Sequence, residues 1–107
     1  MFSKSRIEEI VRKNIEKNER LGNLTDGGFS AHAIYNLGKI NDPKKIKIAN
    51  KDCWEIIYEY SILVTEVRSL EENNSREYDY RKKICVDKDG NVISEDEKEL
   101  LADITWD

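Results

Sequence analysis

The residue types that most often do chemistry in proteins are few in this chain. His32 is the only histidine, and Cys53 and Cys85 are the only cysteines. A nucleophilic triad or dyad would have to be assembled around His32 by folding, and no local motif marks a nucleophile turn. Zinc prefers closely spaced cysteine and histidine ligands, which three scattered residues do not supply. We therefore predict no metal site and no cofactor, and we assign no catalytic residue.

Segment 87–91, Asp-Lys-Asp-Gly-Asn, carries aspartates at the spacing of a calcium loop. An EF-hand also needs glycine at the sixth position of its loop and glutamate at the twelfth. Counted from Asp87, those positions hold Val92 and Lys98. Because Asp89-Gly90 is typical of a tight turn between two strands, we predict a hairpin turn here and no calcium site.

The strongest candidate for binding is a set of aromatic residues with a period of two. From Trp54 to Val64 every second residue is large and apolar or aromatic, and a second segment, 78–86, presents Tyr78, Tyr80, Ile84 and Val86 on one side. Aromatic rings on one sheet face usually form core, but tyrosine hydroxyls need polar partners and could line a small pocket between the sheet and a helix. The candidate ligand-binding residues are Trp54, Tyr58, Tyr60, Tyr78, Tyr80 and His32.

Three apolar residues, Ile57, Leu63 and Val67, fall on the face opposite the aromatic one. A solvated sheet face should be polar, so a C-terminal helix or another chain is expected to cover them. We identify these residues as a candidate interface, which makes a homodimer one form of the protein to test.

One cluster of lysines lies between residues 39 and 51. It could contact an acidic partner or a phosphate backbone, but lysine on an exposed strand also protects a sheet edge from pairing with another chain. The formal net charge of −4 argues against broad nucleic-acid binding, which needs many cations. We favour edge protection for this cluster, whose members are Lys39, Lys44, Lys45, Lys47 and Lys51.

A helix is predicted near the N-terminus. Ser5 and Glu8 form a Ser-x-x-Glu capping box, and Gly22 is a natural helix stop. The apolar residues that follow the cap have the spacing of one helix face: Ile7, Ile10, Val11 and Ile15. Segment 29–39 alternates and contains Gly38, which favours a strand over a helix, and segment 45–48 is a shorter strand.

The two aromatic segments are predicted to pair as an antiparallel hairpin around a polar connection, residues 69–76. The aromatic faces coincide only in every second register, and a loop centred near residue 73 places Tyr60 opposite Ile84 or Val86. Cys85 then faces Glu59 or Ser61, about 20–26 Å from Cys53 at ~3.3 Å per residue. The cysteines are therefore predicted to be separate free thiols.

The C-terminal segment is predicted to be a short helix. Ser94 and Glu97 form a second capping box, and Leu100, Leu101 and Ile104 supply an apolar side. The predicted fold is a single α+β domain over residues 1–107, with a helix at each end and an antiparallel sheet of four or five strands. This element order resembles the cystatin or monellin type, but the Gln-x-Val-x-Gly hairpin of cystatins is absent, so their inhibitory function is not implied.

Size and composition limit the function further. A chain of 107 residues is too short for a two-domain enzyme, and no apolar run reaches the ~18 residues of a membrane span. With two cysteines and no apolar leader, a cytoplasmic location is the simplest expectation. We expect a non-catalytic protein-interaction module with a protein partner. The alternative is a small-molecule-binding protein or enzyme that uses the tyrosine-lined pocket.

Overall fold

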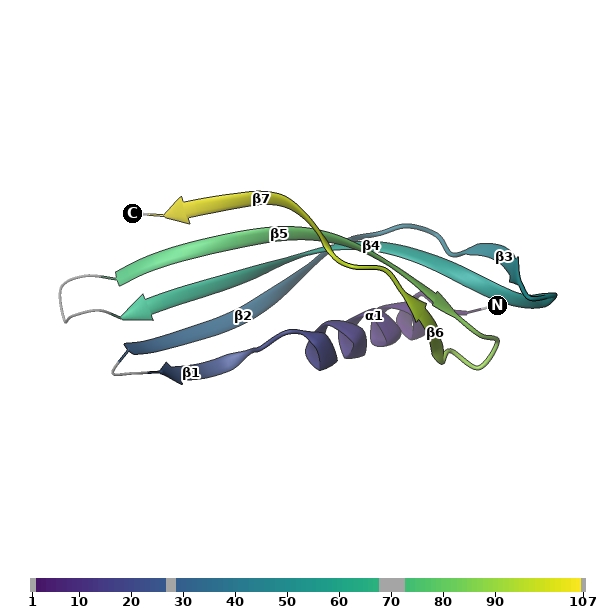
Figure 1. Cartoon of the computed structure of the whole chain (residues 1–107), viewed down its shortest axis with the longest axis horizontal. Helices are drawn as coiled ribbons and strands as arrows, with labels where there is room; N and C mark the ends of the chain where they lie inside the picture. The colour runs from purple at the N-terminus through teal and green to yellow at the C-terminus, as the bar shows by residue number, and fades with distance from the viewer. Residues whose placement is uncertain (1, 27–28, 68–72, 107) are drawn as a thin grey trace.

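The computed structural model describes residues 2–26, 29–67 and 73–106. Within these ranges the chain forms one helix and seven strands (Figure 1). In chain order these elements are α1 (Lys4–Asn18), β1 (Gly22–Asp26), β2 (Phe29–Ile40), β3 (Lys44–Ile48), β4 (Lys51–Val67), β5 (Asn73–Val86), β6 (Val92–Glu95) and β7 (Glu99–Trp106).

The seven strands form one antiparallel sheet built around two long central strands. β4 pairs with β5 from Trp54 to Val67, so β2 and β3 both lie on the other side of β4. In the same way β6 and β7 follow one another along the far side of β5, and β1 completes the opposite edge beside β2. The result is an elongated molecule of 57 × 23 × 22 Å.

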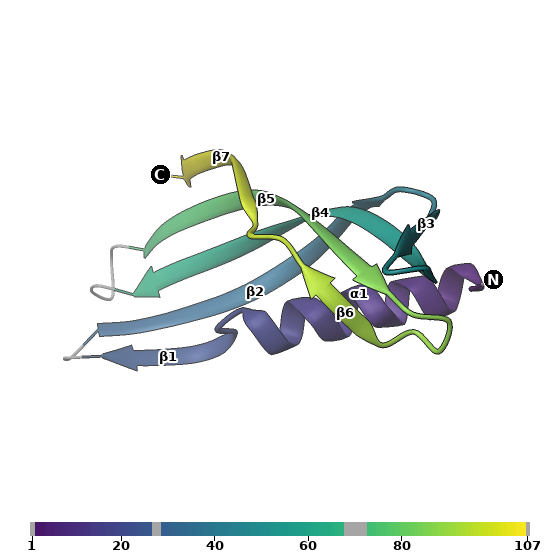
Figure 2. The same ribbon diagram turned by 45° about the vertical axis from the view of Figure 1, so that its right-hand side comes forward.

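Helix α1 lies against one face of this sheet, which we call the inner face (Figure 2). Ser3, and not Ser5 as predicted, caps the helix, because its side chain accepts a hydrogen bond of 3.2 Å from the Arg6 amide. The predicted stripe is confirmed: Ile7, Ile10, Val11 and Ile15 are all buried. A 15-residue helix is about 22 Å long, so α1 covers less than half of the long axis of the molecule.

The core lies between α1 and the even-numbered residues of the two central strands. Ile56, Tyr58, Ile84 and Val86 are almost completely excluded from water. Because consecutive side chains of a strand point to opposite faces, these residues share the inner face, as the period of two predicted.

The register of the central hairpin differs from the predicted one. Tyr60 lies opposite Tyr80, whereas the prediction placed it opposite Ile84 or Val86. The prediction was wrong because the polar residues at the start of β5, from Asn73 on, belong to the strand and not to the connection. The shift is by an even number of residues, so both aromatic sets still point to the inner face. Residues 68–72 of the connection lie outside the described residues. The composition of segment 23–28, with its two glycines, predicts a turn, but residues 23–26 belong to strand β1, and only residues 27–28 lie outside the described residues.

The predicted C-terminal helix is wrong, and the fold is mostly sheet instead of α+β with a helix at each end. Residues 92–95 and 99–106 are the strands β6 and β7, which raises the strand number above the predicted four or five. The far side of β5 offers unpaired backbone groups, and hydrogen bonding to them outweighs a local capping signal. Ser94 lies in β6 opposite Cys85, while Leu100 and Leu101 are exposed.

Candidate functional site

Tyr58, one of the buried tyrosines of the candidate set, belongs to a polar network beneath α1. Its hydroxyl donates a hydrogen bond of 2.5 Å to Oδ1 of Asn14. Nδ2 of Asn14 donates to Glu95 at 2.8 Å, and Nζ of Lys82 reaches the same carboxylate oxygen at 2.9 Å. Burial, and then the negative charges of Glu95 and Glu19, raise the pKa of Tyr58 well above its ordinary value. The phenol therefore stays neutral and its hydroxyl is engaged within the molecule.

The neighbouring tyrosine, Tyr60, is held in a similar way. Its hydroxyl donates to Oε1 of Glu19 at 2.8 Å, and the same oxygen accepts from Nζ of Lys98 at 2.8 Å. The Lys98 ammonium lies 4.3 Å from the centre of the Tyr80 ring, which is a favourable cation–π distance.

The aromatic candidates form a row along the inner face. Ring centres are 5.6 Å apart between Tyr58 and Tyr60, 5.4 Å between Tyr60 and Tyr80, and 6.4 Å between Tyr80 and Tyr78. Trp54 lies at the other end of the sheet, where it packs edge-on against Phe2. Tyr58 and Tyr60 are buried, whereas the other rings are half-buried.

His32, the remaining ligand-binding candidate, lies on the opposite face. It is exposed, pairs with Thr65 across the β2–β4 ladder, and its Nδ1 lies 2.9 Å from Oδ1 of Asn23. Ala33 and Tyr35 are two positions apart on β2, and both point to the inner face. Because successive side chains of a strand point to opposite faces, His32, next to Ala33, points to the outer face. The structure therefore does not bring His32 to the tyrosines.

The outer face carries an apolar group that the sequence revealed only in part. Cross-strand pairing places Ile34 beside Leu63, Leu63 beside Glu77, and Glu77 beside Ile104, in one row over β2, β4, β5 and β7. Trp106 follows in the next row, opposite Ser75. Ile34 is 43% exposed and Trp106 is 53% exposed. We call Ile34, Leu63, Ile104 and Trp106 the outer patch.

Two carboxylates, Glu77 and Asp79, lie at the centre of the outer patch. They are successive outer-face residues of β5, and Ser61 donates a hydrogen bond of 2.6 Å to Asp79. A hydrogen bond shared with Asp79, with some desolvation, raises the pKa of Glu77. Arg81, the next outer-face residue, is engaged with Glu59 and Glu99 instead. Among the described residues no ion pair reaches Glu77 or Asp79, so the patch has an acidic centre.

The three predicted interface residues do not lie together. Leu63 is in the outer patch, but Ile57 lies six residues along β4, opposite Lys83. There it lines a hollow of about 260 Å³ with Lys39, Asn41, Glu59 and Arg81. Val67 pairs through its backbone with Ser30 and Asn73, and its side chain lies outside the described residues.

Sequence reasoning missed the other members of the patch for identifiable reasons. The sequence pattern places Ile104 on the predicted helix and gives no signal for Trp106. Ile34 was detectable, since it lies on the alternate face of the strand predicted over 29–39.

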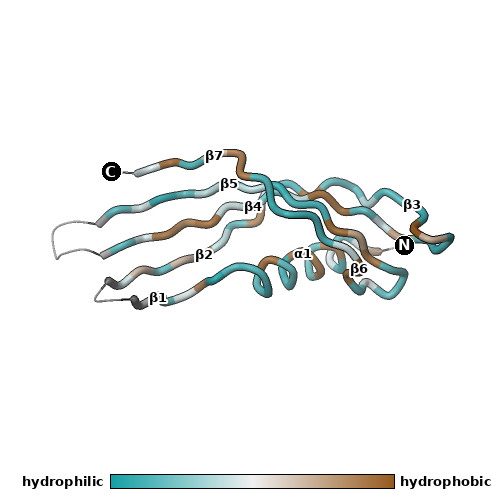
Figure 3. The backbone as a smooth tube through the Cα atoms, in the orientation of Figure 1, coloured by the Kyte–Doolittle hydropathy of each residue, from teal (hydrophilic) through white to brown (hydrophobic). Residues whose placement is uncertain are grey.

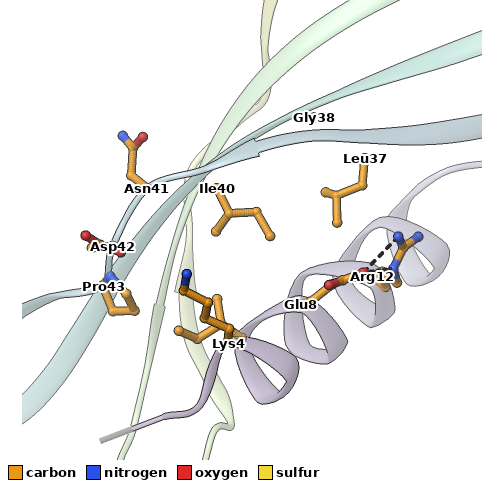
Figure 4. Close-up of a pocket in the computed structure, with 10 residues that line it drawn as sticks. Lys4, Glu8, Arg12, Leu37, Gly38, Ile40, Asn41, Asp42 and Pro43 are labelled. Carbon is orange, nitrogen blue, oxygen red and sulfur yellow. Dashed lines mark hydrogen bonds and ion pairs between the residues drawn. The ribbon is translucent and has the colours of Figure 1, made fainter.

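A larger hollow, of about 470 Å³, lies between α1 and the end of β2 (Figure 4). Lys4, Glu8 and Arg12 project into it from the helix, opposite Leu37 and the segment that leads to β3. Two of these charged groups, Arg12 and Glu8, are already paired: Nε of Arg12 donates to Glu8 at 2.9 Å, and Nη1 donates to the Tyr35 hydroxyl at 3.2 Å.

The cysteines are closer than the predicted 20–26 Å, and that prediction was wrong. Cys85 lies opposite Glu55, and Cys53 is two residues from Glu55 on the same strand. Both thiols are free and buried. Burial, followed by the charge of Glu55, raises the pKa of Cys85, so its environment does not favour the reactive thiolate.

No helix in the described part of the chain is long and apolar enough to cross a membrane. The described residues also contain no group of three or more metal-binding side chains. Comparison with known proteins provides no family: no family model, no curated protein and no solved structure matches this chain.

Proposed function

We propose that this protein is a non-catalytic interaction module that binds a protein partner through the outer patch. The observation that supports this proposal most is the row of Ile34, Leu63 and Ile104, which crosses four strands on a face away from α1. Burying apolar surface is favourable by roughly 25 cal/mol per Å², so a partner that covers this row gains binding free energy.

The patch has the composition of a binding surface rather than of a solvated sheet face. Trp106 supplies a large, half-exposed ring, and aromatic residues are enriched where protein interfaces are most tightly bound. Glu77 and Asp79 add polarity at the centre, which gives the surface specificity for partners without a facing negative charge.

We favour this function over a tyrosine-lined ligand pocket because of the hydrogen bonds on the inner face. The hydroxyls of Tyr58 and Tyr60 already donate to Asn14 and Glu19. A ligand that used those hydroxyls would have to break contacts between the sheet and α1. We also propose a cytoplasmic location, since the two buried thiols are free, as in a reducing compartment.

The test is photo-crosslinking in the native cell, with a benzophenone amino acid placed at Ile34. We expect discrete protein adducts from this position and none from the same probe at Lys47, an exposed position on β3. A Leu63→Glu substitution in the patch should abolish the Ile34 adducts, and circular dichroism verifies that this variant folds. Equal adducts from Lys47, or Ile34 adducts that survive Leu63→Glu, would contradict the proposal.

A further inference from the structure

The outer edge of β7 carries no further strand in the described part of the chain. Within the described residues β7 pairs with β5 alone, so half of its backbone N–H and C=O groups point away from the sheet. Lysines, which commonly protect such edges, occupy β3 at the opposite edge but are absent from β7. Leu100, Leu101 and Trp106 of β7 are instead exposed, and β7 shows two apolar stretches in Figure 3.

We propose that a second copy of this chain pairs with this edge, β7 against β7, in an antiparallel dimer. This inference goes beyond the proposed function, because it concerns the edge of β7, whereas the proposed partner binds the outer face of the sheet. Symmetric dimers of this kind place the same strand of both copies side by side around a twofold axis.

Symmetry limits the register of the two strands. A twofold axis perpendicular to the sheet places the inner faces of both copies on the same side. One residue of β7 must then lie directly opposite the same residue of the second copy. Asp103 at that place would bring two carboxylates together, which is destabilising. Ala102 there would put Leu101, where the β5–β7 ladder is irregular, opposite Asp103. Ile104 at that place keeps the two Asp103 carboxylates apart and pairs residues 102–106 of one copy with residues 106–102 of the other, all in the regular part of the β5–β7 ladder.

The Ile104-centred register gives complementary pairs. Ile104 faces Ile104 of the second copy, and the small Ala102 faces the large Trp106 on the outer face. Asp103 faces Thr105, whose hydroxyl is a donor for the carboxylate. The outer patches of both copies then lie side by side on one continuous sheet. Stacking the two patches face to face would instead bring Glu77 and Asp79 of both copies together.

The register is tested by an Ile104→Cys variant under mild oxidation. Directly opposed residues of antiparallel strands have Cα atoms about 4.5–5.5 Å apart, within the range that a disulfide spans. We expect a disulfide-linked dimer from Ile104→Cys. The matched control is Ala102→Cys, whose own copy lies four residues away, about 14 Å along the strands. Equal crosslinking of Ala102→Cys, or none of Ile104→Cys, would overturn this register.

Association itself is measured by sedimentation. Wild type should have the mass of a dimer, and Ile104→Lys, which places two ammonium groups at the axis, should have the mass of a monomer. Ile93→Lys, a change at an exposed isoleucine of β6, should leave the dimer intact, and circular dichroism verifies the fold of both variants. A wild type that stays monomeric at its highest soluble concentration overturns the dimer. If Ile34 adducts still form in cells, the proposed function survives that failure.

Discussion

The Tyr60 hydroxyl donates a 2.8 Å hydrogen bond to Glu19, the residue that caps the C-terminus of α1. The same carboxylate accepts two contacts from Lys98, at 2.8 and 3.1 Å. This single carboxylate therefore joins three parts of the chain: the middle of β4, the end of the helix, and the segment between β6 and β7. It closes the core at the point where the sheet extends beyond the helix.

The buried Tyr60 phenol should make the protein sensitive to alkaline pH. Burial, and then the hydrogen bond to Glu19, raise the pKa of Tyr60 in the folded state above the value of ~10 in an unfolded chain. Its stabilising contribution is thus complete below about pH 10 and is lost as the pH rises further, because only the unfolded state releases the proton. Urea unfolding from pH 8 to about 11 should show a steeper loss for wild type than for Tyr60→Phe. Parallel curves would contradict this account.

Removing the Tyr58 hydroxyl should destabilise the fold at neutral pH. A Tyr58→Phe variant leaves Oδ1 of the buried Asn14 without its 2.5 Å donor, and such losses amount to about 1–3 kcal/mol. Urea unfolding measures the change. The matched control is Tyr78→Phe, a half-buried ring on the same face, for which we expect a change within about 0.5 kcal/mol. Equal losses from both variants would show that the Asn14 contact is unimportant.

The sequence pattern predicted the two faces of the sheet but not the strand pairing. Alternation decides on which face Tyr58 and Tyr80 lie, and any even shift of register preserves that result. The register itself depends on where β4 ends and β5 begins, and Asn73 and its polar neighbours carry no local signal for a strand. Long-range pairing with β4 determines their conformation.

The error at the C-terminus had the same origin and affected the candidate site. The Ser94–Glu97 pattern is a short-range signal for a helix, whereas β7 forms because the free side of β5 can pair with it. The period of two in the sequence was sufficient to place Leu63 on the outer face. Ile104 and Trp106 could be placed beside it only once their strand was known, since nothing in residues 99–106 states which strand they join.

The acid side of the stability curve should depend on Glu95. Hydrogen bonds from Asn14 and Lys82 lower the pKa of Glu95 in the folded state. Its contribution is therefore present above the unfolded pKa of ~4.3 and is lost as the pH falls below that value. The difference in unfolding free energy between wild type and Glu95→Gln should thus shrink from pH 6 to about 3. The control is Glu97→Gln, which removes an exposed carboxylate nearby. The difference in unfolding free energy between this variant and wild type should stay constant over the same pH range.

Gly90 should tolerate a methyl group less well than Gly22, although both have φ of +85°. Alanine at either position should lower the free energy of unfolding by about 1–2 kcal/mol, because its Cβ makes the left-handed backbone conformation unfavourable. A Cβ at Gly22 has no atom within 4 Å, but at Gly90 it would lie 2.7 Å from Nη2 of Arg6 and 3.2 Å from Cδ1 of Ile10. Arg6 must then move and give up its 3.2 Å hydrogen bond to the Asp89 carbonyl.

The comparison of these two variants isolates the contact from the backbone strain. Thermal unfolding should show a loss for Gly22→Ala and a larger one for Gly90→Ala, by roughly 0.5–1.5 kcal/mol for the lost hydrogen bond. Because the hairpin that contains Gly90 leads directly into β6, the same variant should weaken the docking of β6 against α1. Equal losses would mean that the Arg6 contact contributes nothing, and that backbone conformation alone requires glycine at position 90.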